Sequence, residues 1–216
     1  MPAPTRSTDP VFIDRPTRVL PFLAWPSDNR TLFTDPARFV ARTRANPDYG
    51  RPGFTRDCGR RFHRGLDIAP AHAEPDGRLH RVVFSDCARG TEYPSDEPGW
   101  IPRDRLYAMA DGVVAERHDT AETSTLGRHL ILFHRWPGST TAAFYALYAH
   151  LDEITVAEGA TVTAGQVIGT MGMTSASADA RTWMAIAPHL HLEFFDERGR
   201  SFDPEQFLCA LLVRHG

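Results

Sequence analysis

Three groups of residues have the types and the spacing that can hold a metal ion. The first is His63 with Asp67, the second is His150, and the third is His189 with His191. Two or three histidines with one carboxylate are the usual protein ligands of a catalytic zinc ion, which keeps a fourth position for water. Zinc lowers the pKa of that water to about 7 and so makes hydroxide available at neutral pH. Together the three groups predict metal-assisted hydrolysis.

The third group is predicted to lie on a strand. Alternate residues of a strand face the same side, so His189, His191 and Glu193 would share one polar face. Two imidazoles side by side on that face can hold a metal ion or work beside one. The opposite face would be the core face, with Leu190, Leu192 and Phe194.

The other two groups depend on a strand and on a bend. His150 is predicted to share a strand face with Phe144, Ala146 and Tyr148. Gly65, between His63 and Asp67, permits a bend that brings both side chains together. A single histidine is more often structural than a ligand, and this interpretation is given to His72, His80, His118, His129, His134 and His215.

Short strands separated by Gly, Asp and Pro fill the chain from residue 106 to residue 195. Their β-prone runs lie at 113–114, 130–133, 143–151, 161–162 and 167–169. The pairs Asp35-Pro36 and Asp203-Pro204 are typical helix starts, and they predict one short helix near each end of the chain. Residues 71–105 are polar, apart from one strand-like run at 81–84, and indicate a long excursion from the fold.

Composition narrows the range of functions. The 216 residues carry a net charge of −3, which gives no bulk attraction to nucleic acid. No stretch approaches the roughly 20 apolar residues of a membrane span. The chain contains no lysine. Its three cysteines allow one disulfide, Cys58 to Cys87, but three reduced thiols, including Cys209, are the favoured interpretation.

Taken in order, the motifs resemble those of the lysostaphin-like zinc endopeptidases. The matching pieces lie at 62–69, 110–114, 148–151, 159–169 and 188–194, and Asp203-Pro204 sits where that family often ends. They include His-Arg-Gly-Leu-Asp, Tyr-Ala-His-Leu and Pro-His-Leu-His-Leu-Glu-Phe. Each piece alone is weak support, whereas all of them in this order across residues 60–204 are specific.

The resemblance implies a role for each residue of the three groups. His63, Asp67 and His191 would bind Zn²⁺, and His150 and His189 would be catalytic. One of the two would take a proton from water, and the other would hydrogen-bond the oxyanion. The implied fold is mainly β, an antiparallel sheet or sandwich with a peptide-binding groove, short N- and C-terminal helices and a long insertion. The implied activity is hydrolysis of the peptide cross-links or stems of bacterial peptidoglycan.

The same resemblance divides the chain into an N-terminal extension, 1–50, and a zinc peptidase domain, 51–216, with the insertion at 71–105. The insertion and the long stretch at 175–187 depart from the family pattern and leave the substrate preference open. Peptidoglycan lies outside the cytoplasmic membrane, so a periplasmic or extracellular location is expected. Residues 1–10 have no apolar segment, so export would need a leader that this chain does not carry.

Other interpretations fit parts of the sequence. A catalytically silent or latent cell-wall-binding module would use the same fold to regulate other wall hydrolases, and latency could place Asn29 or Asn46 at the metal. A structural zinc site would need a fourth ligand, for which Cys58 is the nearest cysteine. Glu193 could serve as a group that orients a ligand imidazole. Residues 156–172 resemble a half-motif of biotinyl or lipoyl carriers, but a carrier needs a lysine for attachment.

Overall fold

A computed structural model of the chain describes residues 2–14, 24–42, 46–71, 103–121, 123–136, 139, 143–176 and 188–212. Within these ranges the protein is mainly antiparallel β structure with two short helices, α1 (Pro36–Phe39) and α2 (Pro204–Leu212), as expected. Both helices begin at a proline that follows an aspartate, because proline is tolerated in the first helical turn. The run at 81–84 and nearly all of the insertion at 71–105 lie outside the described residues.

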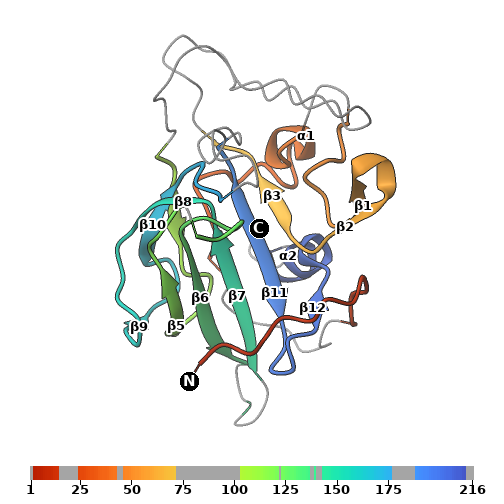
Figure 1. Ribbon diagram of the computed structural model, residues 1–216. Helices are drawn as coiled ribbons and strands as arrows, with labels where there is room; N and C mark the ends of the chain where they lie inside the picture. Colours follow the sequence, from red (N-terminus) through yellow and green to blue (C-terminus); the bar gives the residue numbers. More distant parts are fainter. Residues whose placement is uncertain are drawn as a thin grey trace.

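The main sheet has seven strands and includes Asp67 and His191 of the predicted site (Figure 1). Its order is β12-β11-β7-β6-β5-β9, and β3 also pairs with β11. The strands are β3 (Leu66–Ile68), β5 (Gly112–His118), β6 (His129–Arg135), β7 (Ala143–Ala149), β9 (Thr161–Val162), β11 (Leu190–Phe195) and β12 (Ser201–Phe202). The five runs predicted between residues 106 and 195 all fall in strands, and 143–151 divides at His150 into β7 and a further strand, β8 (Leu151–Ile154).

Two smaller sheets flank the main one (Figure 1). One is three-stranded and has the order β4-β10-β8, with β4 (Arg105–Tyr107) and β10 (Val167–Met171). The other is the hairpin of β1 (Gly53–Arg56) and β2 (Arg61–His63), which turns through a short 3-10 helix (Asp57–Gly59). This hairpin leads directly into β3, so it positions the first group of the predicted site.

The alternation predicted for the third group is confirmed within β11, whereas His189 precedes this strand. Leu190, Leu192 and Phe194 are fully buried in the main core, and the Phe207 ring of α2 stacks on Phe194 with centroids 4.3 Å apart. The opposite face of the same sheet carries a second, smaller apolar cluster that includes Ala149 and Phe195. His191 and Glu193 therefore stand on the second face, away from α2.

Strand register brings distant residues together on that second face. His191 lies opposite Ala149 of β7 on one side and opposite Asp67 of β3 on the other. Ala149 in turn lies opposite His129 of β6. Antiparallel partners that lie directly opposite each other present their side chains on the same face. The pairing of β3 with β11 therefore places the first and third groups side by side.

The segments before residue 51 are attached to the rest of the fold. Isolated bridges join Ile13 to Phe202, Ser27 to Leu106, and Val40 to Ile68. Ala41 also donates its backbone N–H to the carbonyl of Asp67, at 2.8 Å. The division into an extension, 1–50, and a domain, 51–216, stays a prediction, and these contacts show that both parts share backbone hydrogen bonds.

Two further findings bear on the sequence predictions. Cys58 is disulfide-bonded, so the favoured interpretation of three reduced thiols is wrong for this residue, whereas Cys209 is a free thiol. Cys87 lies outside the described residues. Over the part of the chain that the structure describes, no helix has the length and apolar character needed to cross a membrane.

The burial of His134 predicts that the stability of the protein depends on pH. His134 is wholly buried beside the Phe144 ring, with centroids 4.9 Å apart, and burial lowers its pKa from 6.5 to about 4. Between these values the unfolded chain binds a proton that the folded protein does not, so stability is present above pH 6.5 and lost as pH falls. We expect the free energy of unfolding to fall by about 3 kcal/mol from this residue, measured by denaturant unfolding across pH.

The matched variant for this measurement is His134→Leu, which cannot titrate. Its own stability differs from the parent's at every pH, so the slopes against pH are compared rather than the absolute values. A shallower slope between pH 6.5 and 4 is expected, and a variant as steep as the parent would contradict the assignment.

Candidate metal centre and active site

Three of the predicted residues converge as a possible ligand set. His63, Asp67 and His191 are all buried, and they form a group that could hold a metal ion, with one donor atom from each. His63 Nε2 is 3.2 Å from His191 Nδ1 and 3.2 Å from Asp67 Oδ1, and His191 Nδ1 is 2.9 Å from Asp67 Oδ1. Donor atoms around tetrahedral zinc with bonds of about 2.1 Å are about 3.4 Å apart. The triangle of donor atoms therefore fits a zinc ion.

Hydrogen bonds on the far side of each imidazole fix which nitrogen faces this triangle. His63 Nδ1 donates to the carbonyl oxygen of Arg51 at 2.8 Å, so its Nε2 is left for the metal. His191 Nε2 donates to Glu193 Oε1 at 2.9 Å, so its Nδ1 faces Asp67. A ligand histidine that donates its other N–H to a carboxylate or carbonyl is typical of metal sites. Glu193 thus stands where the sequence suggested a group that orients an imidazole.

The electrostatics of the triangle favour a cation. Burial opposes charge on His191, but hydrogen bonds to Asp67 and Glu193 raise its pKa to about 9. Burial also opposes ionisation of Asp67, yet its charged neighbours His63 and Arg56 hold the pKa of that carboxyl well below its usual range. The two buried carboxylates, Asp67 and Glu193, thus favour a positive charge at this point.

Arg56 is a neighbour of the triangle that the sequence did not reveal. Its guanidinium forms a buried ion pair with Asp67 Oδ2, the oxygen outside the triangle, and its Nη2 is 3.0 Å from His63 Nε2. The guanidinium also lies over the Tyr49 ring, 3.7 Å from the centroid. Because Arg56 precedes the motif by seven residues and belongs to β1, no spacing within the motif could have found it.

Gly65 has a stronger reason than a bend to be glycine. A Cβ at this position would lie 2.7 Å from both ring nitrogens of His191, a separation at which something must shift. We expect Gly65→Ala to displace the His191 ring and weaken zinc binding by about tenfold or more, as loss of a ligand's orientation does. Competition with a chromophoric chelator measures this affinity. An affinity equal to the parent's, with the fold intact by circular dichroism, would contradict it.

His150 and His189 lie beside the triangle without belonging to it. Their ring centroids are 4.7 Å apart, and the His150 centroid is 5.7 Å from that of His191. His189 Nε2 is 3.7 Å from Asp67 Oδ1. All five predicted residues are therefore brought together, three as a possible ligand set and two as its neighbours.

One expectation for His150 is wrong. It was predicted to continue the strand face of Phe144 and Tyr148, but β7 ends at Ala149 and His150 has a φ of 66°. The left-handed backbone turns the chain, so the side chain leaves the core face and approaches His191 on the second face. Its Nδ1 donates to the carbonyl oxygen of Thr174 at 2.7 Å. Burial lowers the pKa of His150 well below its usual value.

The remaining described histidines behave as structural residues, as interpreted. His118 and His129 stack with centroids 4.8 Å apart on the partner strands β5 and β6. His129 Nδ1 bonds the carbonyl of Gly127, and His118 Nε2 bonds Thr123 Oγ1. The other three predicted structural histidines, His72, His80 and His215, lie outside the described residues.

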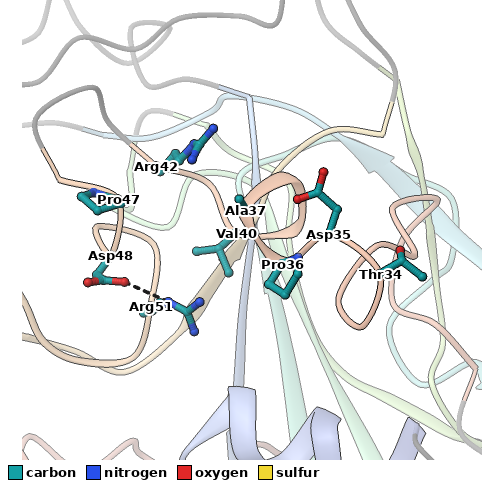
Figure 2. A pocket seen from close by; sticks show the side chains of 9 residues that line it. All are labelled: Thr34, Asp35, Pro36, Ala37, Val40, Arg42, Pro47, Asp48 and Arg51. Atoms are coloured by element: carbon teal, nitrogen blue, oxygen red, sulfur yellow. Dashed lines mark ion pairs between the residues drawn. The ribbon is translucent and has the colours of Figure 1, made fainter.

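A hollow is lined by α1 and by the loop that precedes β1 (Figure 2). Its volume is about 390 Å³. Arg51 lines it and forms ion pairs with Asp48, at 3.0 Å, and with Glu205. These ion pairs neutralise the Arg51 guanidinium, whereas a second arginine, Arg42, also lines the hollow. The backbone carbonyl of Arg51 connects it to the histidine site, because it accepts a hydrogen bond from His63 Nδ1.

The latent arrangement with an asparagine on the metal is not found. Asn29 donates its amide to the carbonyls of Arg38 and Ala69, at 3.0 and 2.9 Å, and its oxygen accepts from Thr31. Asn46 donates to the carbonyl of Thr55 and accepts from the Asp48 backbone. Both side chains are therefore used in holding loops. The structural-zinc interpretation also loses Cys58, because a sulfur in a disulfide is not a thiolate ligand.

Comparison with known proteins identifies the family. A family model matches residues 101–204 of the chain, and it describes peptidase family M23. Residues 101–204 belong to peptidase family M23. This match supports a peptidase, and hence a hydrolase. The M23 region includes His150, His189 and His191 but begins after His63 and Asp67, which reach it through the pairing of β3 with β11.

Several solved structures are similar to this chain. The catalytic domain of lysostaphin from Staphylococcus simulans is 19% identical with a TM-score of 0.43, over 79% of this chain and 92% of that one. Csd3 from Helicobacter pylori is 18% identical with a TM-score of 0.43, over 88% of this chain and 34% of that one. A zinc-containing peptidase from Vibrio cholerae is 22% identical with a TM-score of 0.36, over 77% and 40%. No curated protein matches the sequence.

Proposed function

We propose that this M23 peptidase is a zinc-dependent endopeptidase that hydrolyses peptide bonds in bacterial cell-wall peptidoglycan. The observation that carries the proposal is the triangle of donor atoms from His63, Asp67 and His191, with two further histidines beside it. A closed structural site would use a fourth protein ligand instead. The set of three, with two titratable neighbours, supports a catalytic role.

His63 Nε2, Asp67 Oδ1 and His191 Nδ1 are the atoms that would hold zinc. When bound there, zinc would polarise the scissile carbonyl and make a water molecule acidic enough to attack it at neutral pH. Glu193 and the Arg51 carbonyl would keep the two imidazoles in orientation. Asp67 would be held from its other oxygen by Arg56.

His150 is the better candidate for the general base. Its Nδ1–H is committed to the Thr174 carbonyl, so a neutral ring presents an unprotonated Nε2. Its lowered pKa keeps the ring neutral at pH 7, which leaves it ready to take a proton from the attacking water. This assignment goes beyond the sequence, which left the roles of His150 and His189 open.

His189 would then act on the substrate oxygen. It lies next to the ligand His191 in the chain and 3.7 Å from Asp67 Oδ1, without being part of the triangle. From there a ring N–H can hydrogen-bond the oxygen that gains negative charge as the carbonyl is attacked. The proton held by His150 would pass to the leaving amine, so both histidines serve the same turnover.

The peptidoglycan substrate and the location outside the membrane are supported by the family and by the disulfide. Disulfides persist in oxidising compartments such as the periplasm and the extracellular space, and Cys58 is disulfide-bonded. The expected peptide-binding groove stays a prediction. Its floor would be the second face of the sheet, which carries His191 and the smaller apolar cluster.

The testing experiment measures zinc and turnover on the same sample of full-length protein. Elemental analysis gives the zinc content, and release of new amines and muropeptides from purified peptidoglycan gives the activity. We expect one zinc per chain, loss of amine release with a chelator, and recovery on adding zinc. Zinc without turnover would contradict the substrate assignment, and absence of zinc would contradict the ligand set.

The alternative of a silent module is weaker, because such a module has no need of the complete set of five residues that meet here. A latent enzyme remains testable through deletion of residues 1–50. A gain of activity on deletion would favour latency, whereas the contacts of residues 2–14 with the site lead us to expect a loss.

A further inference from the structure

We propose that Arg6 is a positioning residue of the metal centre, so that the N-terminal strap, residues 2–14, is a working part of the peptidase. This inference rests on the proposed zinc site and deepens it. Arg6 lies 95 positions before the M23 match begins at residue 101, within the predicted extension 1–50.

The contact between Arg6 and the site is direct and charged. Arg6 Nη1 is 2.9 Å from Glu193 Oε1 and 2.8 Å from Oε2, so one nitrogen reaches both carboxylate oxygens. The Glu193 side chain is only 5% exposed, whereas that of Arg6 is 32% exposed. Arg6 therefore forms an ion pair with a buried carboxylate.

Glu193 connects Arg6 to His191, one of the three proposed metal ligands. Its Oε1 accepts the Nε2–H of His191 at 2.9 Å, while His191 Nδ1 faces the metal triangle. The direction of the His191 ring therefore depends on the direction of the Glu193 carboxylate, which Arg6 holds from its outer side. A carboxylate behind a ligand histidine fixes the ring and affects metal affinity.

The strap holds Arg6 in place from both sides. Ser7 donates its backbone N–H to the Gly199 carbonyl at 2.8 Å, and Ile13 donates to the Ser201 carbonyl at 2.9 Å. Ala3 packs against the smaller apolar cluster on the second face of the sheet. In Figure 1 the strap, in red, runs from the N-terminus across the lower part of β7 and β11 to β12. Arg6 is thus delivered by a docked segment.

Removal of Arg6 has two effects of opposite sign on zinc binding. Loss of a positive charge near the site favours a bound cation, whereas loss of the anchor of Glu193 frees the carboxylate and the His191 ring. The guanidinium is about one-third exposed, so solvent screens its charge. Its hydrogen bonds end on a buried carboxylate and are not screened in this way. We therefore expect the loss of orientation to prevail.

The test is a zinc competition titration of full-length, zinc-free protein against a chromophoric chelator at neutral pH. Arg6→Ala is expected to weaken zinc binding by about tenfold, near the lower end for a partner of a metal ligand. Arg6→Lys keeps the charge and one hydrogen bond, and should recover part of the affinity. Arg117→Ala is the matched control, because it removes an arginine and its ion pair with Asp119 away from the site.

A double-mutant cycle shows whether Arg6 acts through Glu193. In a Glu193→Gln background, Arg6→Ala should change zinc affinity by less than about twofold, since the path to His191 is already altered. Equal effects of Arg6→Ala in both backgrounds would overturn the proposal. Tighter zinc binding by Arg6→Ala would overturn it too, because Arg6 would then only repel the metal.

The outcome for the parent separates this inference from the function on which it rests. A parent that binds zinc, with an Arg6→Ala variant of equal affinity, would overturn the role of Arg6 alone. A parent that binds no zinc would overturn the metal centre and this inference with it. Activity is not needed for either reading.

Discussion

His150→Ala should lower the turnover of peptidoglycan peptides by about 10²–10⁴-fold, the range for loss of a general acid–base group. The zinc content should stay at the parent's level, because His150 is not in the donor triangle. The reason lies in its fixed tautomer: Nδ1–H is bound to the Thr174 carbonyl, so only Nε2 can take a proton. Amine release from purified peptidoglycan measures the effect.

His189→Ala should cause a comparable loss, and the double variant should be little worse than either single variant. Residues that act as a unit in one reaction step show this failure of additivity. His118→Ala is the matched control, since His118 bonds Thr123 Oγ1 and lies outside the five residues of the site. A His150→Ala enzyme within tenfold of the parent would exclude His150 as the base.

Asp67→Asn should abolish measurable zinc binding and destabilise the protein. The change removes the only carboxylate among the three ligand candidates, and it leaves the buried Arg56 guanidinium without its charge partner. Breaking a buried ion pair from one side costs about 3–5 kcal/mol. Denaturant unfolding of the zinc-free protein separates this cost from the loss of metal, which elemental analysis reports.

Asp57→Asn is the matched control for Asp67→Asn. Asp57 also pairs with an arginine, Arg61, but both side chains are about 60% exposed. An exposed pair contributes about 0–1 kcal/mol, so this variant should keep its zinc and nearly all of its stability. Full zinc occupancy in Asp67→Asn would remove Asp67 from the ligand set.

Much of the fold and of the candidate site could be predicted, because residue period and motif spacing determine them. The two-residue period of β11 separates the buried face of Leu190 and Leu192 from the His191 face, and the structure has both faces as expected. The aspartate–proline pairs mark both helix starts correctly. None of the five predicted site residues is informative alone. Their order along the chain singled them out, and the structure brings all five close together.

Other parts of the site could not be predicted, because they depend on backbone atoms or on distant segments. The carbonyls of Arg51 and Thr174 fix two histidine tautomers, and any residue type could supply them. Arg6 and Arg56 are ordinary arginines in sequence, and only tertiary folding brings them to Glu193 and Asp67. Strand alternation failed at His150, where a single left-handed residue redirects the side chain.

The pairing of β3 with β11 has a consequence for the folding process. His63 and His191 are separated by 128 positions, yet their ring nitrogens are 3.2 Å apart. An ion held between them acts as a removable cross-link that closes most of the chain into one loop. Closing so long a loop costs entropy before any contact is gained, so the metal pocket assembles late, once the sheet has joined its distant strands. Zinc capture during refolding would therefore mark the end of folding and would not nucleate it.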